Sequence, residues 1–207
     1  MRGRFITLEG GEGVGKSTQL GALADAIRAR GHRVITTREP GGSEGAEAIR
    51  ALLMQGSEEK WSARAEALLF AAARADHVEK LIRPALDRGE WVLCDRFIDS
   101  SRAYQGGAGG LDDDDVIALH AVGSEGILPD RTLVLTLPPS DAEARAMARD
   151  GGKVDRFGAR NIDYHQEVAR RFNGFAQSEP ARLRLIDANG SMSEVTARLV
   201  TEIEDLL

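Results

Sequence analysis

The strongest constraint on the fold is a glycine-rich segment near the start of the chain. Residues 10–17 read Gly-Gly-Glu-Gly-Val-Gly-Lys-Ser and fit the pattern G-x-x-x-x-G-K-[ST]. This pattern needs a strand before it and a helix after it, so that backbone N–H groups and a helix N-terminus surround a phosphate. Both neighbours qualify, because 5–9 is apolar and 16–30 is amphipathic. We therefore predict a phosphate-binding loop made of Gly10, Gly11, Glu12, Gly13, Val14, Gly15, Lys16 and Ser17.

In such a loop, Lys16 reaches the β- and γ-phosphates of a nucleotide and the Ser17 hydroxyl binds Mg²⁺. The motif alone does not separate kinases from GTPases or mechanical ATPases. The chain contains no Asn-Lys-x-Asp segment, the motif that reads guanine in GTPases. This argues against a GTPase and leaves the rest of the chain to identify the acceptor.

Beyond this loop, apolar strand-like runs alternate with helical patterns. We expect strands at 5–9, 34–38, 91–95, 132–137 and 183–187, and a long helix at 62–88 with a kink near Pro84. Such alternation is typical of an α/β protein whose parallel sheet is flanked by helices on both faces. Ligands of these sheets bind at the carboxyl ends of the strands. The length suits a single domain over residues 1–207.

The composition argues against several classes of protein. A formal net charge of −6 disfavours a general nucleic-acid-binding protein, and the longest apolar run, 67–73, is too short to span a bilayer. The N-terminus enters a strand-like segment at once, which leaves no room for a signal peptide. Cys94 is the only cysteine, so an intramolecular disulfide is impossible and a reducing compartment is favoured. We expect a cytoplasmic protein without nucleic-acid or membrane partners.

Charged residues at the ends of two predicted strands indicate a second site. The strand 91–95 ends in Asp95 and is followed by Arg96; the carboxylate suits Mg²⁺ and the guanidinium suits a phosphate. Arg38 ends the strand 34–38, just before a rigid Pro-Gly-Gly turn. We expect both arginines to reach one phosphate that does not belong to ATP. The alternative is that they are solvated charges or part of a surface ion pair.

Two further patterns point to a nucleobase and to a lid. Phe70 and Arg74 lie four residues apart on a helix and share a face, so the ring can stack on a base while the guanidinium donates to its carbonyl oxygens. A phenylalanine on an alanine-rich helix is also typical of a core. The cationic stretch at about 145–160 is typical of a mobile lid, or else of a solvated helix face. Its cations are Arg145, Arg149, Lys153, Arg156 and Arg160.

Four segments together resemble bacterial thymidylate kinases. They are residues 9–18 around the phosphate loop, Thr-Arg-Glu-Pro-Gly-Gly at 37–42, Asp-Arg-Phe at 95–97 and Ala-Tyr-Gln-Gly-Gly at 103–107. The resemblance implies the P-loop NTPase fold of nucleoside monophosphate kinases, with a five-stranded parallel sheet, and a homodimer. It also implies transfer of the γ-phosphoryl group of ATP to dTMP, with Mg²⁺, giving dTDP and ADP in dTTP biosynthesis.

The same resemblance implies roles for individual residues. Thr18 extends the ATP-binding loop, Arg145 joins the ATP site, and Ser17 and Asp95 are the metal ligands. The implied dTMP-binding residues are Glu12, Arg38, Phe70, Arg74, Arg96, Ser101, Tyr104 and Gln105.

Within this set, Arg38 and Arg96 hold the dTMP phosphate, and Glu12 approaches the sugar 3′-hydroxyl. Phe70 stacks on thymine while Arg74 bonds its edge, and Ser101 and Gln105 contact the base. Tyr104 lies against the deoxyribose, where a 2′-hydroxyl would crowd it.

Position 13 separates two types of catalytic site. Some members of the family carry an arginine directly after the acidic residue of the phosphate loop, where this chain has Gly13. The chain therefore resembles the type whose lid supplies the catalytic cations. The predicted catalytic residues are Lys16, Arg96, Arg149 and Arg156.

Three alternatives stay open at this point. A kinase for another small acceptor, such as a deoxynucleoside, keeps the phosphate loop and loses the thymine contacts. A nucleotide-binding switch or ATPase shows no acceptor-dependent turnover. A non-catalytic dimerisation module has no need of Lys16 after Gly15.

Overall fold

The computed structural model describes residues 2–138, 140–142, 144–145, 156–158 and 160–207. At its centre is a five-stranded parallel sheet with the strand order β2-β3-β1-β4-β5. The strands are β1 Phe5–Glu9, β2 Val34–Arg38, β3 Trp91–Asp95, β4 Arg131–Thr136 and β5 Leu183–Asp187. The predicted α/β class with a five-stranded parallel sheet is confirmed, and β4 alone departs from its predicted bounds.

β4 begins and ends one residue earlier than predicted. Arg131 already pairs with Ile6 of β1, so the strand starts there. Leu137 leaves the ladder ahead of Pro138, which has no N–H to donate to a neighbouring strand.

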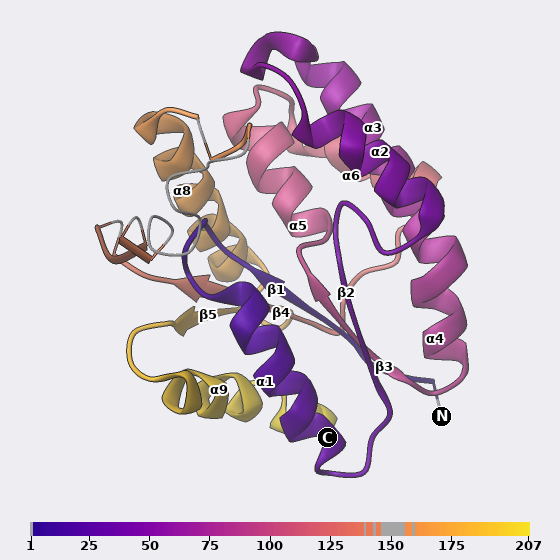
Figure 1. The fold of residues 1–207 in the computed structure, drawn as a ribbon, viewed down its shortest axis with the longest axis vertical. Helices are drawn as coiled ribbons and strands as arrows, with labels where there is room; N and C mark the ends of the chain where they lie inside the picture. Colours follow the sequence, from indigo (N-terminus) through magenta and orange to yellow (C-terminus); the bar gives the residue numbers. More distant parts are fainter. Residues whose placement is uncertain (1, 139, 143, 146–155, 159) are drawn as a thin grey trace.

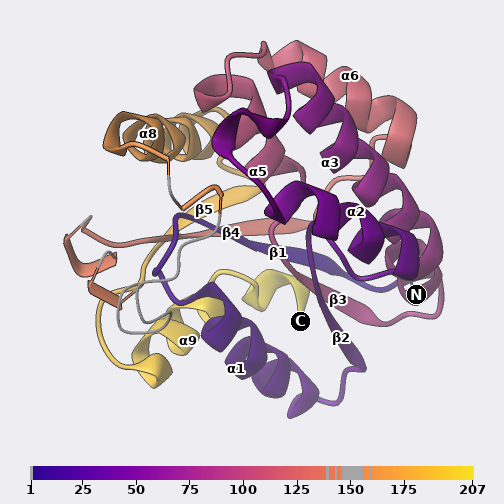
Figure 2. The same ribbon diagram turned by 45° about the horizontal axis from the view of Figure 1, so that its top comes forward.

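Helices cover both faces of the sheet (Figures 1 and 2). On one face lie α1 Lys16–Arg28 and α9 Met192–Thr201. Toward the other face lie α2 Glu44–Met54, α3 Ala63–His77, α4 Arg83–Asp87, α5 Ile98–Ser101, α6 Asp113–Ser124 and α8 Ile162–Ser178. Short 3₁₀ turns occupy Glu58–Lys60 and Glu204–Leu206. Alternation along β1 sets the two cores, because Ile6 and Leu8 join the α1 side and Phe5 joins the opposite side.

The helix predicted at 62–88 is interrupted before Pro84. α3 continues into a π-helical segment, η2 Val78–Ile82, and α4 begins at Arg83. A proline lacks an N–H and crowds the carbonyl four residues earlier, and a wider π turn relieves that clash.

A second π-helical segment, η3 Arg102–Ala108, follows α5 directly and is not predicted from the sequence. π turns of this kind are frequent at functional sites. This one carries Tyr104 and Gln105, two of the predicted acceptor contacts.

The carboxyl ends of three neighbouring strands meet at one edge of the sheet. β1 leads into the phosphate loop, β2 ends at Arg38 and β3 ends at Asp95; Arg38 and Asp95 are register partners. The strand order reverses around β1, where open α/β sheets bind ligands. The lid expected at 145–160 lies largely outside the described residues.

Candidate active site

The phosphate loop connects the end of β1 to the first residue of α1. Gly15 caps α1 with a φ of 92°, a conformation that glycine adopts without steric cost. Gly10 has a φ of 128°, and a Cβ there would lie 2.4 Å from the carbonyl oxygen of Leu135. These two positions therefore require glycine, and they aim the N-terminus of α1 at the loop, an arrangement that binds anions.

Lys16 begins α1 with its ammonium group inside the loop. Its Nζ donates to the carbonyl oxygens of Gly10 at 3.2 Å and Gly11 at 2.7 Å. Burial, reinforced by the charge of Arg96, lowers the pKa of Lys16 to about 8. An anionic ligand would stabilise the charged form of this buried amine, so the group is well suited to bind phosphate.

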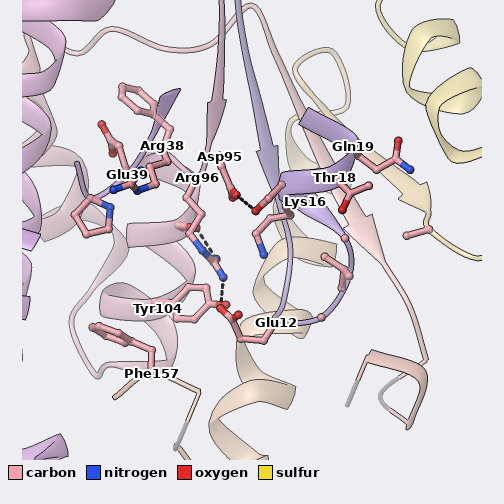
Figure 3. Close-up of a pocket in the computed structure, with 18 of the residues that line it drawn as sticks. Glu12, Lys16, Thr18, Gln19, Arg38, Glu39, Asp95, Arg96, Tyr104 and Phe157 are labelled. Carbon is pink, nitrogen blue, oxygen red and sulfur yellow. Dashed lines mark hydrogen bonds and ion pairs between the residues drawn. The ribbon is translucent and has the colours of Figure 1, made fainter. Parts of the chain in front are cut away.

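Ser17 and Asp95 place two oxygen atoms beside Lys16. The Ser17 hydroxyl donates to Asp95 Oδ2 at 2.9 Å (Figure 3). Mg²⁺ prefers such oxygen ligands, and in nucleotide sites one or two protein groups hold it together with phosphate oxygens. The described part of the chain has no cluster of three or more His, Cys, Asp or Glu side chains that could hold a metal by themselves. The Ser17–Asp95 pair fits the Mg²⁺ that accompanies a bound nucleotide.

Arg96 points across the cavity from the end of β3 (Figure 3). Its φ of 68° lies in the left-handed region, which is costly for a non-glycine residue and is found mainly at functional sites. Nη2 donates to Glu12 at 2.7 Å, and the guanidinium lies 4.9 Å from the ring centre of Tyr104. Arg96 thus connects the phosphate loop to the predicted acceptor side.

Arg74 is buried between α3, α5 and the end of β2. Its Nε donates to Glu39 at 2.8 Å and its Nη2 donates to the Ser101 hydroxyl at 2.7 Å. The other carboxylate oxygen of Glu39 lies 3.0 Å from His77 Nδ1. Glu39 and His77 are not predicted as site residues from the sequence, although His77 lies one turn after Arg74 on α3. This buried network holds Arg74 in one orientation, because breaking a buried ion pair is costly.

A cavity of about 580 Å³ connects these groups, a volume typical of ligand sites. Arg38 lies at this cavity, exposed, and donates to the Glu47 carboxylate at 2.9 Å. Gly10 and Gly11 contribute to the site through their contacts with Lys16. The predicted residues that line the cavity are Glu12, Gly13, Val14, Gly15, Lys16, Ser17, Thr18, Arg38, Phe70, Arg74, Asp95, Arg96, Ser101, Tyr104, Gln105 and Arg145.

A model of thymidylate kinase matches residues 8–199. The chain belongs to the thymidylate kinase family. It is similar to a thymidylate kinase from Rhizorhabdus wittichii, with 61% identity over the full length of both chains. A thymidylate kinase from Bradyrhizobium diazoefficiens is 48% identical over all of this chain and 91% of the relative.

A solved structure gives the same family. The crystal structure of thymidylate kinase from Ehrlichia chaffeensis matches with a TM-score of 0.77 and 28% identity, over 97% of this chain and 98% of the other. As a member of the thymidylate kinase family, the protein is a kinase with the P-loop NTPase fold. None of the described helices is long and apolar enough to cross a membrane.

Arg145, one of the predicted lid arginines, reaches the cavity. It lines the cavity and donates to the carbonyl oxygen of Ala188 at 3.3 Å. Arg149, predicted to be catalytic, lies outside the described residues. Its role stays a prediction.

Arg156, the other predicted catalytic lid residue, is buried and forms an ion pair with Glu66. The next residue, Phe157, lines the cavity and packs edge-on against Phe70, with ring centres 5.6 Å apart. Glu66 and Phe157 are not predicted as site residues from the sequence. The spacing of Glu66, Phe70 and Arg74 at i, i+4 and i+8 places all three on one face of α3 and is the signal that points to Glu66.

Proposed function

We propose that this protein transfers the γ-phosphoryl group of ATP to dTMP, giving ADP and dTDP for dTTP synthesis. The observation that carries the proposal is one cavity in which the phosphate loop meets Phe70, Arg74 and Tyr104. A nucleotide switch or an ATPase needs the loop but has no use for this second half. The names of the relatives support dTMP as the acceptor.

On the donor side, the amides of the phosphate loop and Lys16 bind the β- and γ-phosphates, and Thr18 extends this contact. Ser17 and Asp95 would hold Mg²⁺, which supplies positive charge to the phosphate oxygens when bound. No protein nucleophile is needed, because an oxygen of the dTMP phosphate attacks the γ-phosphorus as the bond to the bridging oxygen breaks. The chain contributes position and charge.

On the acceptor side, Arg38 and Arg96 bind the dTMP phosphate in place of their carboxylate partners. A guanidinium forks onto phosphate oxygens as readily as onto a carboxylate. Glu12, once released by Arg96, accepts from the sugar 3′-hydroxyl. Tyr104 packs against the deoxyribose and leaves little room for a 2′-hydroxyl.

The thymine ring lies between the α3 side chains and η3. Phe70 stacks on it, since an aromatic ring offers a large apolar surface. Arg74 Nη1, which has no hydrogen-bond partner among the described residues, donates to a base carbonyl. Ser101 and Gln105 complete the contacts to the base edge.

The transferring phosphoryl group needs a cation that the phosphate loop does not provide, because position 13 is glycine. We assign this role to the lid arginines Arg145, Arg149 and Arg156. Arg145 already lines the cavity, whereas Arg156 has to release Glu66 in order to act. Closure of a mobile lid over 145–160 would exclude water that otherwise hydrolyses ATP.

The deciding experiment measures ADP formation from ATP with each nucleoside monophosphate in turn. We expect dTMP to give the highest kcat/KM, and little ADP without an acceptor. Lys16→Ala is the matched control: it should keep its melting temperature and lose most of its turnover, because Lys16 faces the ligand. Acceptor-independent ADP formation, or near-normal turnover in the purified variant, would contradict the proposal.

We also propose that residues 1–207 form one domain of a cytoplasmic homodimer that acts on small molecules, with no nucleic-acid or membrane partner. The family resemblance supports a dimer, as do large apolar side chains exposed on α3 and α6, with Leu68 54% and Val122 87% exposed. Light scattering at micromolar concentration should give the mass of two chains. The mass of one chain would rule the dimer out.

A further inference from the structure

Glu66 is a buried acid on α3 to which the chemistry above gives no role beyond its pairing with Arg156. It is 5% exposed and lies one helical turn before Phe70. One of its carboxylate oxygens accepts from Gln105 Nε2 at 3.1 Å. The other forms the ion pair with Arg156, and Arg160 lies 3.8 Å away. Two cations and one amide therefore hold this carboxylate in place.

The contact with Glu66 decides which end of the Gln105 amide faces the cavity. An ionised carboxylate only accepts hydrogen bonds, so the NH₂ group of Gln105 must face Glu66. Gln105 is 3% exposed and lines the cavity. Its Oε1 has no hydrogen-bond partner among the described residues. This oxygen is not one of the fully buried polar atoms that lack a partner, so part of its surface is accessible. The carbonyl oxygen is thus the end that Gln105 offers to a ligand.

Arg74 and Gln105 consequently present a donor and an acceptor to the base. Arg74 supplies only donors, while Gln105 supplies an acceptor. Thymine and uracil carry a carbonyl oxygen at position 4 next to an N3–H donor, which match this pair. Cytosine carries an amino group at position 4 next to an unprotonated N3, which reverses both requirements. The arrangement therefore selects a 4-oxo pyrimidine.

We propose that Glu66 is a positioning residue that fixes the Gln105 amide and so makes the site prefer 4-oxo over 4-amino pyrimidine nucleotides. The proposal rests on the proposed function, since it assumes that the base lies between Arg74 and Gln105. Glu66 touches no substrate atom and acts only through the amide that it orients.

Glu66→Gln tests this because glutamine has nearly the same shape and is able to donate. A donor at position 66 pairs equally well with Gln105 Oε1, so the amide is free to turn and present NH₂ to the base. The full chain is titrated with dUMP and with dCMP by calorimetry. Both ligands lack the 5-methyl group and differ only at this base edge. We expect the ratio of dUMP to dCMP affinity to fall by roughly tenfold or more.

Three comparisons separate this role from a merely structural one. Glu66→Asp keeps a group that only accepts, so the preference for dUMP should survive even if both affinities fall. Gln105→Leu should lower the ratio by itself, and adding Glu66→Gln to it should change the ratio less than about twofold. Loss of Arg156 pairing weakens both ligands alike and cancels in the ratio.

An unchanged ratio in Glu66→Gln, or the same change with leucine at position 105, would overturn the proposal. If Glu66→Gln does not fold, the comparison of wild type with Gln105→Leu still decides, and an unchanged ratio there refutes the role of Gln105 as acceptor. Failure of the proposed function has a different signature: the wild type would bind ATP but not dUMP.

Discussion

Asp99 is the residue whose replacement should destabilise the fold most clearly. It is fully buried on α5, and its carboxylate accepts from both nitrogens of the Arg182 fork, at 2.6 and 2.9 Å. Arg102 and Thr132 donate to the same carboxylate at 3.1 and 3.0 Å. These bonds tie α5, which begins two residues after Arg96, to β4 and to Arg182, which directly precedes β5. We predict that Asp99→Asn is strongly destabilising.

The size of the effect follows from the charges. Asparagine has nearly the same volume, so no cavity forms, but the change leaves two guanidinium groups facing an amide that carries its own donors. Removing one partner of a buried ion pair costs about 3–5 kcal/mol, out of a total stability of roughly 5–15 kcal/mol. For a chain of this length, the melting temperature should fall by roughly 6–20 °C.

The effect should also depend on pH. Burial alone would raise the pKa of Asp99, but the hydrogen bond and charge of Arg182, with the charge of Arg102, hold the pKa below its ordinary value. Its stabilisation is therefore complete above the unfolded pKa, near 3.9, and is lost as the pH falls through the lower folded pKa. The difference in unfolding free energy between wild type and variant should be constant from about pH 6 to 8 and should shrink below about pH 4.

Urea unfolding followed by circular dichroism measures this difference. Asp115→Asn is the matched control, because Asp115 is exposed on α6 and its replacement should change stability by less than about 0.5 kcal/mol. A loss below about 1 kcal/mol for Asp99→Asn at pH 7 would refute the reasoning. So would a difference that stays the same at pH 8 and at the acid end of the titration.

Four other predictions concern the site. Burial, with the charge of Asp99, raises the pKa of Glu9 to about 7 from an ordinary 4.5. Ionisation of Glu9 therefore lowers the stability of the wild type as the pH rises from about 4.5 to about 7. Toward pH 8, the melting temperature of Glu9→Gln should fall less than that of the wild type. Arg74→Ala should raise KM for dTMP more than KM for ATP. It should also cost about 3–5 kcal/mol in urea unfolding, because it removes the buried guanidinium partner of Glu39. Equal changes in both KM values would contradict the base contact. Ribothymidine monophosphate should be a poorer acceptor than dTMP; Tyr104→Phe should keep and Tyr104→Ala should relax that difference in kcat/KM. The last prediction concerns Arg145→Ala, Arg149→Ala and Arg156→Ala. At least one of these variants should cut kcat by about a hundredfold with little change in substrate affinity. Normal turnover in all three would place the catalytic cation elsewhere.

The parts of the site that the sequence predicts correctly are those defined by local pattern. The phosphate loop needs glycine where φ is positive, and Lys16 follows it at a fixed spacing. Strand ends are equally local, because an apolar run that stops at Arg38 or Asp95 marks the ligand-binding edge of a parallel sheet. These features place the phosphate loop, Arg38 and Arg96 at the cavity without knowledge of the packing.

The pairings inside the cavity are harder to predict because they join distant segments. Glu39 and Arg74 are 35 positions apart, and Glu66 and Gln105 are 39 apart. Each pairing depends on how α3 packs against the end of β2 or against η3. The π turn in η3 adds a further difficulty, since the 3.6-residue period does not give the direction of its side chains.

Arg74 and Arg96, two of the predicted dTMP-binding residues, differ in how deeply their ion pairs are buried. The Arg74–Glu39 pair has side chains only 3% exposed, so separating it would leave a buried charge at a cost of several kcal/mol. The Arg96–Glu12 pair has side chains 18% and 33% exposed, so solvent reaches it and weakens it relative to the Arg74–Glu39 pair. A dianionic phosphate should therefore displace Glu12 more readily than Glu39. Arg74 is consequently suited to recognise the base as a fixed arm, and Arg96 is suited to exchange an internal partner for the acceptor phosphate.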